Sequence, residues 1–263
     1  METYKDSLDF LTPLVNNSIS NSLPSSNTTV CQFPHVTLSF AQTLDGYISH
    51  TSKTPIKISS PPSFIMTHTL RSLHDGILVG IETILSDDPR LTLRLNGILE
   101  SSPSSVKSRP IILDSRLRFP LESKCLKEYK DGRGGKPWIF TTHVGEATGR
   151  IPVLEEAGIQ VNVVDGDNEG KISISAMLKV LGNQNLKKLM VEGGSRIIHS
   201  FLTSKYNDLP LTNLVIITIA PTFLGDGVKV LSSGGKHSNL PRFTNVKYHQ
   251  FGPDIVMAGN IAT

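Results

Sequence analysis

The sequence contains few cysteines and few aromatic residues. Only two of its 263 residues are cysteine, and aromatic side chains make up 6% of the chain. Cys31 and Cys125 stand far apart, without a CxxC pair or a Cys/His cluster. This spacing argues against a disulfide framework and against a structural zinc site. A chain of this length can instead bury a sizeable apolar core, so we expect neither a metal nor covalent cross-links.

Long hydrophobic runs and long runs of one charge are also absent. No apolar stretch approaches the ~20 residues that a membrane helix needs, and the first residues carry acids where a secretion signal would carry basic residues. Lys and Arg number 26 and Asp and Glu number 23, with no basic run that concentrates positive charge. We therefore expect a cytoplasmic protein that binds neither membranes nor nucleic acids.

The signatures of several protein classes are missing as well. The sequence has no G-x-G-x-x-G after a strand pattern, no H-E-x-x-H, no G-x-S-x-G and no H-x-E with P-C-x-x-C. These absences exclude an ordinary Rossmann fingerprint, zinc proteases, ordinary α/β-hydrolases and zinc deaminases. Residues 132–136 (GRGGK) resemble a phosphate loop, but Pro137 replaces the required Ser or Thr. We interpret this segment as a surface turn.

Strand and helix patterns alternate along most of the chain. An alternating strand pattern occupies residues 36–41, and short apolar runs typical of strands occupy residues 76–80, 110–113, 137–141, 159–164 and 188–191. Helical patterns lie at residues 61–73, 175–181 and 195–202. This alternation predicts a three-layer α/β fold with an open, mostly parallel sheet. Another apolar run, residues 214–220, precedes a hairpin pattern over 246–258, so we expect an antiparallel C-terminal end.

The first 33 residues differ from the rest. Residues 1–15 have an amphipathic pattern, and residues 16–29 are polar and rich in turn formers. The regular pattern begins at Pro34, and no internal repeat or further boundary follows. We predict an N-terminal extension and linker over residues 1–33 and a single domain over residues 34–263.

One segment combines an apolar strand with a glycine pair and a helix start. Glu192 ends the strand pattern, Gly193 and Gly194 follow, and a helix begins near Ser195. Paired glycines let the backbone approach a ligand closely, and the first amides of a helix attract phosphate. Ser195 is expected to cap this helix. Spacing alone fits an ordinary tight bend between strand and helix equally well.

Three further loops follow predicted strands. Residues 80–94 (GIETILSDDPRLTLR) carry acids, arginines and Thr83, and the alternative to a ligand site is a solvated loop with an Asp–Arg ion pair. Asp45 precedes Gly46 in a pair typical of turns, and Asp114 follows the strand pattern at 110–113. Because carboxyl ends of parallel strands meet at one sheet edge, these loops and the glycine pair are expected to form one cleft.

Four blocks in this order resemble one family. They read SFAQTLDGYIS, DGILVGIETILSDDPRLTLR, RPIILDSRLRFP and LMVEGGSRIIHSFL. Over residues 34–259 they are similar to the riboflavin-biosynthesis pyrimidine reductases, in the stand-alone form of fungi and archaea. The resemblance implies a dihydrofolate-reductase-like fold. It also implies reduction of the ribosyl side chain of a phosphorylated pyrimidine by NADPH, with NADH as the alternative donor. Two-domain relatives add a zinc deaminase domain, whose motif is missing here, so we expect reduction without deamination.

The resemblance also implies which residues form the site. Ten positions would contact the cofactor: Thr83, Asp87, Asp114, Ser115, Val164, Glu192, Gly193, Gly194, Ser195 and Arg196. Three would contact the substrate: Leu91, Arg94 and Glu192, with Arg94 suited to the 5′-phosphate. Asp114 and Ser115 would lie on the ribose side of the cofactor, and Val164 near its nicotinamide half. Ser115 and Arg116 suit the extra phosphate of NADPH, and Asp45 is the candidate for proton delivery or for binding the pyrimidine.

The resemblance further implies a homodimer. The sequence offers only the apolar run 214–220 as a contributor, and a core strand explains that run equally well. Two other functions stay open. One is a dihydrofolate or pterin reductase on the same fold, and the other is a non-catalytic nucleotide-binding module that uses the glycine pair alone.

Overall fold

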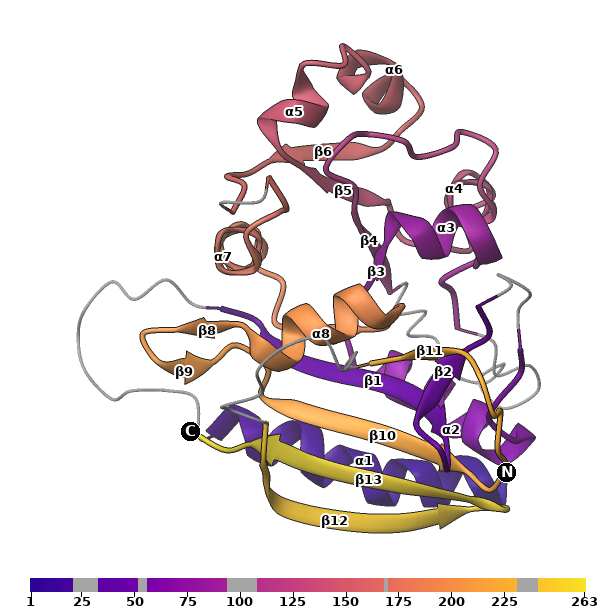
Figure 1. Ribbon diagram of the computed structural model, residues 1–263. Helices are drawn as coiled ribbons and strands as arrows, with labels where there is room; N and C mark the ends of the chain where they lie inside the picture. The colour runs from indigo at the N-terminus through magenta and orange to yellow at the C-terminus, as the bar shows by residue number, and fades with distance from the viewer. Residues whose placement is uncertain (21–32, 52–55, 94–107, 168–169, 231–240) are drawn as a thin grey trace.

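Nine strands form one sheet in the computed structural model, which describes residues 1–20, 33–51, 56–93, 108–167, 170–230 and 241–263 (Figure 1). They are β1 (His35–Thr43), β3 (Gly76–Gly80), β4 (Arg109–Leu113), β5 (Trp138–Thr141), β6 (Gln160–Val163), β7 (Lys188–Val191), β10 (Leu214–Ala220), β12 (Phe243–Phe251) and β13 (Asp254–Ile261). Their order is β12-β13-β10-β1-β7-β3-β4-β5-β6. Neighbours from β10 to β6 pair in parallel, whereas β13 and β12 pair antiparallel. This confirms the predicted mostly parallel sheet with an antiparallel end.

Helices cover both faces of this sheet. They are α1 (Glu2–Ser20), α2 (Pro61–Ser72), α3 (Ile81–Asp87), α4 (Lys124–Lys130), α5 (His143–Glu146), α6 (Ile151–Glu156), α7 (Ile174–Asn183) and α8 (Ser195–Thr203). Apolar residues of α7 and α8 share one buried cluster with β1, β7 and β4. On the opposite face, α3, α4 and α6 pack against β3 to β5, and α1 and α2 pack against β10 and β13. The fold therefore has the three layers expected from the sequence.

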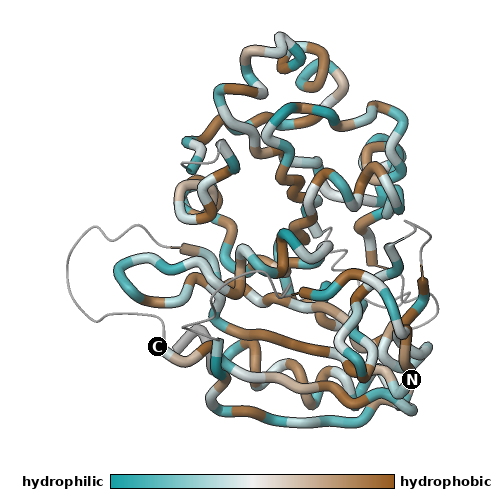
Figure 2. Tube along the Cα trace, in the orientation of Figure 1, coloured by the Kyte–Doolittle hydropathy of each residue, from teal (hydrophilic) through white to brown (hydrophobic). Residues whose placement is uncertain are grey.

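The central strands are buried on both faces, which explains their continuous apolar runs. All five residues of β3 are buried. Leu78 belongs to the cluster under α7 and α8, whereas Ile77 and Val79 belong to the cluster that includes Ile84 of α3. Successive side chains of a strand point to opposite faces, so a strand between two helical layers needs apolar residues at every position. Figure 2 shows this hydrophobic character along β10 in the lower half of the molecule.

The N-terminal extension forms a longer helix than its sequence pattern predicts. α1 continues to Ser20, although the polar linker was expected to begin at residue 16. Leu11 and Val15 of α1 are fully buried in one cluster with Met66 and Leu70 of α2. Burial of this apolar stripe stabilises the helix through its polar last turn. The rest of the predicted linker lies outside the described residues.

Short strands complete the architecture. The predicted turn at Asp45 and Gly46 is present, with Gly46 at a φ of +80°. The strand that follows, β2 (Tyr47–Ser49), pairs with β11 (Val228–Lys229) in a two-stranded sheet of its own. β8 (Lys205–Tyr206) pairs with β9 (Leu209–Pro210) in another. Within the described residues, none of the helices combines the length and apolar character needed to cross a bilayer.

Candidate active site

The loops singled out in the sequence lie at one edge of the sheet. β1, β3, β4 and β7 are parallel, so the residues that follow them emerge on the same side. Glu192 follows β7, α3 follows β3, and Asp114 follows β4. This arrangement confirms that the polar loops share the carboxyl edge, where open α/β sheets bind their ligands.

Asp45 lies farther out along the strand direction than the other loops. Leu38 of β1 pairs with Val191, the last residue of β7, and β1 continues to Thr43. These five further residues extend the strand by about 16 Å at ~3.3 Å per residue. Asp45 and Glu192 therefore do not form a compact pair, and only an elongated ligand could contact both.

The glycine pair leaves the start of α8 open. Gly194 is the N-cap residue and Ser195 is the first helical residue, so the expected capping role of Ser195 is wrong. Gly194 has ordinary backbone angles, and a Cβ atom placed there would meet no described atom within 4 Å. Neither conformation nor packing requires glycine at this position. The bare backbone instead fits the close approach of a phosphate to the positive end of the helix.

Gly193 has a different reason to be glycine. Its φ is +157°, and a Cβ atom would lie 3.2 Å from Cβ of Ile197 in the first turn of α8. Gly80, at the end of β3, also packs against this side chain, because a Cβ there would lie 2.9 Å from Cγ1 of Ile197. Both glycines therefore let α8 pack closely over the ends of β3 and β7.

Glu192 forms a buried ion pair that sequence reasoning missed. Arg71, in the last turn of α2, donates from Nε to Oε1 and from Nη2 to Oε2 of Glu192, each at 2.7 Å. Burial lowers the pKa of Arg71, but the charge and hydrogen bonds of Glu192 outweigh that effect and raise it. Arg71 Nη1 also donates to the Thr92 carbonyl at 3.4 Å. Nothing in the local pattern of α2 singles out Arg71, because its partners come from distant loops.

α3 presents two predicted cofactor residues on one side. Thr83 and Asp87 are separated by four positions in this helix, so they lie on the same face. Thr83 is half-buried and Asp87 is exposed. Both side chains are thus at least partly open to solvent, and their contact with a cofactor stays a prediction.

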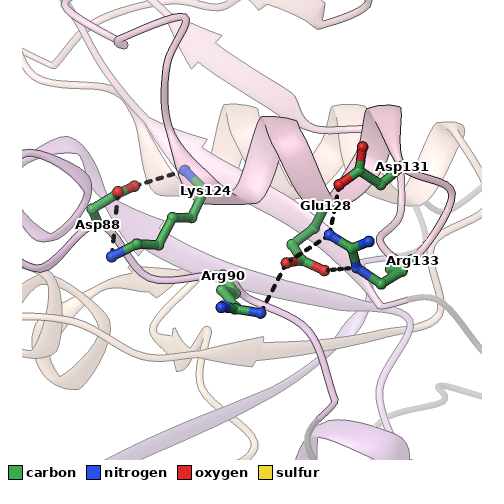
Figure 3. Close-up of polar contacts among 6 residues, drawn as sticks. All are labelled: Asp88, Arg90, Lys124, Glu128, Asp131 and Arg133. Carbon is green, nitrogen blue, oxygen red and sulfur yellow. Dashed lines mark hydrogen bonds and ion pairs between the residues drawn. The ribbon is translucent and has the colours of Figure 1, made fainter.

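The loop after α3 is tied to α4 (Figure 3). Asp88 accepts a hydrogen bond from the Lys124 amide at 2.8 Å, and Arg90 lies 3.2 Å from Glu128. The proposed alternative of an ion pair for this loop is thus present for Arg90, but its partner is a glutamate of α4. Glu128 also pairs with Arg133 at 2.7 Å.

The two predicted substrate residues of this loop have different outcomes. Leu91 is buried in the cluster that also holds Leu126 of α4, and it has a φ of +52°. Its side chain faces the core, which leaves its backbone for any ligand contact. Arg94, the candidate for the 5′-phosphate, lies outside the described residues.

Asp114 is directed into the protein. Its carboxyl group is fully buried, accepts a hydrogen bond from the Phe119 amide at 2.9 Å and lies 3.9 Å from Nε of Arg118. Burial raises the pKa of Asp114, against the opposing hydrogen bond from Phe119. A fully buried carboxyl that accepts a hydrogen bond within its own turn presents little surface to a ribose, and the contact of Asp114 with the cofactor stays a prediction. Ser115, which is half-buried, and the exposed Arg116 are the better candidates there.

Strand order argues against a place for Val164 near the nicotinamide. Val164 follows β6, the outermost parallel strand, two strands beyond β4 and therefore about 10 Å farther from β1 than Ser115. Its side chain is largely buried in the cluster beneath α7. If Ser115 lies along the adenosine ribose, Val164 lies still farther toward the adenosine end.

Asp45 connects two loops. Its carboxylate accepts hydrogen bonds from the Thr43 hydroxyl and from the Leu224 and Gly225 amides, at 3.1 and 2.8 Å from Oδ2 for the two amides. Desolvation raises the pKa of Asp45, but these hydrogen bonds outweigh it and hold the pKa at about 2. Such a carboxylate is ionised at neutral pH, which argues against a proton-donating role. That role stays a prediction.

The described residues contain no group of three or more His, Cys, Asp or Glu side chains that could hold a metal ion. The site residues described above offer backbone amides, carboxylates, hydroxyls and guanidinium groups. These are groups that bind and orient phosphorylated ligands.

Comparison with known protein families identifies the family of this chain. The RibD C-terminal domain family matches residues 34–257. The chain belongs to this family. The matched region includes eight strands of the nine-stranded sheet in full, the first four residues of β13, and all the site residues described above. α1 lies outside the match, although it shares a buried cluster with α2 and β10.

Individual relatives of this RibD C-terminal domain protein carry more specific names. The 2,5-diamino-6-ribosylamino-4(3H)-pyrimidinone 5′-phosphate reductase of Candida glabrata is 34% identical over 203 residues, covering 75% of this chain and 79% of the relative. The reductase of the same name from Debaryomyces hansenii is 35% identical over 236 residues, covering 87% and 90%. The structure of the riboflavin biosynthesis reductase Rib7 of Saccharomyces cerevisiae gives a TM-score of 0.73 at 26% identity, covering 98% of this chain and 100% of that chain.

Proposed function

We propose that the protein reduces the ribosyl side chain of 2,5-diamino-6-ribosylamino-4(3H)-pyrimidinone 5′-phosphate to the ribitylamino product, with NADPH as hydride donor, in riboflavin biosynthesis. Fungal relatives of that name, 34% and 35% identical over most of their lengths, support the substrate. The open start of α8 supports the cofactor. The single observation that carries the proposal is Gly194. The described fold does not require glycine at this position, and a backbone without a side chain fits a dinucleotide diphosphate.

The residues of the carboxyl edge divide between two ligands in this proposal. Gly193, Gly194, Ser195 and Arg196 hold the cofactor diphosphate, because the first amides of α8 and one guanidinium group offer donors to it. Thr83 and Asp87 contact the same cofactor from α3. Ser115 with Arg116 takes the 2′-phosphate that distinguishes NADPH from NADH, a contact that suits a guanidinium group.

The substrate lies on the side of Glu192 and the loop after α3. Glu192 pairs with Arg71, and its side-chain oxygens can accept further hydrogen bonds from substrate hydroxyls. The Leu91 backbone lines the same side, and Arg94 binds the 5′-phosphate. This division separates the diphosphate of the cofactor, which pairs with Arg196, from the phosphate of the substrate, which pairs with Arg94.

The proposed reaction needs few catalytic side chains from the protein. The ribosylamine ring opens to an imine, whose carbon is the former anomeric carbon. When bound, the nicotinamide supplies a hydride to that carbon. The imine nitrogen then needs one proton, which water can provide. The chain's own residues orient the carbon and exclude bulk solvent, and this positioning is the main catalytic contribution. We propose that the ionised Asp45 acts by fixing the loop at residues 221–227.

An assay with two substrates tests the proposal. NADPH oxidation is followed with the ribosylaminopyrimidine phosphate and, separately, with dihydrofolate, and the product is examined for a gain of two hydrogens. We expect turnover with the first substrate only, and faster turnover with NADPH than with NADH. Turnover with dihydrofolate alone would instead favour a pterin-type reductase. Cofactor binding without turnover of either substrate would favour a non-catalytic nucleotide-binding module.

We further propose that the protein is a cytoplasmic homodimer. The run 214–220 forms β10, which lies between β1 and β13, so the core explains it without a subunit contact. The outer strand β12 is the better candidate, because one edge is unpaired among the described residues and Tyr248 is 67% exposed. Sedimentation velocity of the wild type and of Tyr248→Glu tests this: we expect a dimer and a shift toward monomer. A monomeric wild type would contradict the proposal.

A further inference from the structure

The segment from Asp88 to Thr92 joins the cofactor side of the site to the substrate side. It belongs to no helix or strand and contains two non-glycine residues with left-handed backbone angles, Asp88 at a φ of 42° and Leu91 at a φ of 52°. Such angles are unfavourable for residues that carry a Cβ atom. The segment therefore needs contacts from outside to keep its shape.

α4 supplies most of these contacts. The Lys124 amide donates to Oδ1 of Asp88 at 2.8 Å, and Lys124 Nζ lies 3.6 Å from Oδ2. Leu91 packs into the cluster that contains Leu126. Glu128, one turn farther along α4, accepts from Arg90 at 3.2 Å (Figure 3). At its other end the segment is held by Arg71, which donates to the Thr92 carbonyl.

Glu128 is the least exposed charged side chain in this network. Its side chain is 8% exposed, whereas those of Arg90 and Arg133 are 55% and 58% exposed. Oε2 accepts from Nε of Arg133 at 2.7 Å, and Asp131 accepts from the same arginine at 2.6 Å. The hydrogen bond from Arg133 lowers the pKa of Glu128, with help from the charge of Arg90. Glu128 thus stays ionised, and Arg133 orients it toward Arg90.

We propose that Glu128 is a positioning residue for the substrate side of the site, acting through Arg90 on the Asp88–Thr92 segment. This inference rests on the proposed function, because it assumes that the Leu91 backbone contacts the pyrimidine phosphate. Asp87 precedes the segment and is carried by α3, so the cofactor side does not depend on Glu128. Loss of the ion pair should therefore affect the two ligands unequally.

Two variants separate this role from general stability. Glu128→Gln keeps the shape of the side chain but removes its charge. Asp131→Asn is the matched control, because it removes a carboxylate that contacts Arg133 without contacting Arg90. Both arginines are more than half exposed, so water can solvate them when a partner is lost, and both variants should fold. Equal melting temperatures, within about 3 °C, check this.

Kinetics and proteolysis then test the proposal. For Glu128→Gln we expect the KM for the pyrimidine phosphate to rise about fivefold, with kcat and the KM for NADPH changed by less than about twofold. Arg90→Ala should raise the same KM, and the double variant should add nothing further, since both changes remove one interaction. Trypsin should cleave after Arg90 about tenfold faster in Glu128→Gln than in the wild type or in Asp131→Asn.

The two readouts fail independently. A wild type that does not reduce the pyrimidine phosphate refutes the proposed function, while the trypsin experiment still shows whether Glu128 holds Arg90. Unchanged cleavage after Arg90 in Glu128→Gln overturns the inference. So does an equal rise of both KM values, or the same kinetic change in Asp131→Asn.

Discussion

The starts of two helices, α2 at the antiparallel end and α8 at the carboxyl edge, show how the two parts of the sheet differ. α2 begins with Pro61 and Pro62, which have no amide hydrogen, and the amide of Ser60 donates to Asp254 at 2.8 Å. α8 begins after Gly194 without a side-chain cap. Neither helix has a side-chain cap, but the two prolines remove two amide donors from the start of α2, whereas α8 keeps its first amides for another group.

This difference distinguishes the antiparallel part of the sheet, which supports the site, from the parallel part, which is proposed to bind the ligands. The hairpin between β12 and β13 fixes Ser60 through Asp254, and α2 then carries Arg71 to Glu192 at its other end. The antiparallel part thus supplies a rigid frame, while the parallel part presents unsatisfied donors and bare backbone at its carboxyl edge. A helix start attracts an anion only when no side chain or proline has already removed its free donors.

The largest expected effect is loss of cofactor binding when a charge is placed at the start of α8. Gly194→Asp adds a carboxylate beside the proposed diphosphate and should weaken NADPH binding about a thousandfold, since like charges near a surface repel by ~4 kcal/mol. Asp is a good N-cap residue, so the melting temperature should not fall. Titration of the two proteins with NADPH measures the effect.

Gly194→Asn is the matched control for that substitution. It has nearly the same shape and also caps helices, but it carries no charge. We expect it to weaken NADPH binding much less, by about tenfold, through crowding of the bare backbone alone. If Asp and Asn weakened binding equally, the proposed anion site at α8 would be wrong.

The antiparallel end should respond in the opposite way. Leu11→Ala removes a fully buried side chain between α1 and α2 and should lower the free energy of unfolding by about 3 kcal/mol. Both KM values should stay as they are, because the cluster that contains Leu11 includes none of the predicted cofactor or substrate residues. Leu209→Ala, at a 59% exposed position, is the control with little expected effect on stability. Urea unfolding and steady-state kinetics measure both; a raised KM in the folded Leu11 variant would contradict the separation.

Acid should destabilise the protein through two buried histidines. Burial lowers the pKa of His35 to about 4, with help from His74 and Lys188, and burial lowers the pKa of His74 to about 4 as well. The unfolded chain, with ordinary histidine pKa values near 6.5, binds protons first. Stability is therefore full above about pH 6.5 and falls toward pH 4.

Replacing one of these histidines should flatten this dependence. His35→Asn should lose about 2 kcal/mol less stability than the wild type between pH 7 and pH 4.5, since one group with a lowered pKa is gone. Thermal or urea unfolding at the two pH values measures it. An equally steep loss in the variant would show that His35 does not contribute.

The smallest expected effect concerns Asp45. Asp45→Asn weakens the hydrogen bonds to Leu224 and Gly225 and should lower kcat/KM about fivefold by loosening the loop. The pH profile of kcat should keep its shape, because an ionised carboxylate with a pKa near 2 donates no proton. A profile that lost one limb would instead assign Asp45 the general-acid role. No change in turnover or in substrate affinity would remove Asp45 from the site.

The sequence predicts strands better than it predicts the contacts that shape the site. Buried parallel strands such as β3 need apolar residues on both faces, so their runs are visible without a partner. The glycine pair before α8 is visible for a similar reason, because its requirement is local. α3 and α4 were not predicted as helices, since each is seven residues long and too short to show a clear period.

The remaining features depend on partners far apart in the chain. Arg71 and Glu192 are 121 positions apart, and Arg90 and Glu128 are 38 positions apart. Asp114 follows a strand just as a ligand-binding acid would, but its partner Phe119 turns it inward. Only the folded chain decides whether such an acid faces a ligand or its own backbone.

Hydrogen exchange with and without NADPH tests the separation of the two parts most directly. The first amides of α8, near residues 195–197, should exchange slowly only when NADPH is bound, because the diphosphate then accepts their hydrogen bonds. Exchange over β12 and β13 should be the same in both states. Slower exchange in that hairpin without any change at the start of α8 would place the cofactor elsewhere and contradict the account.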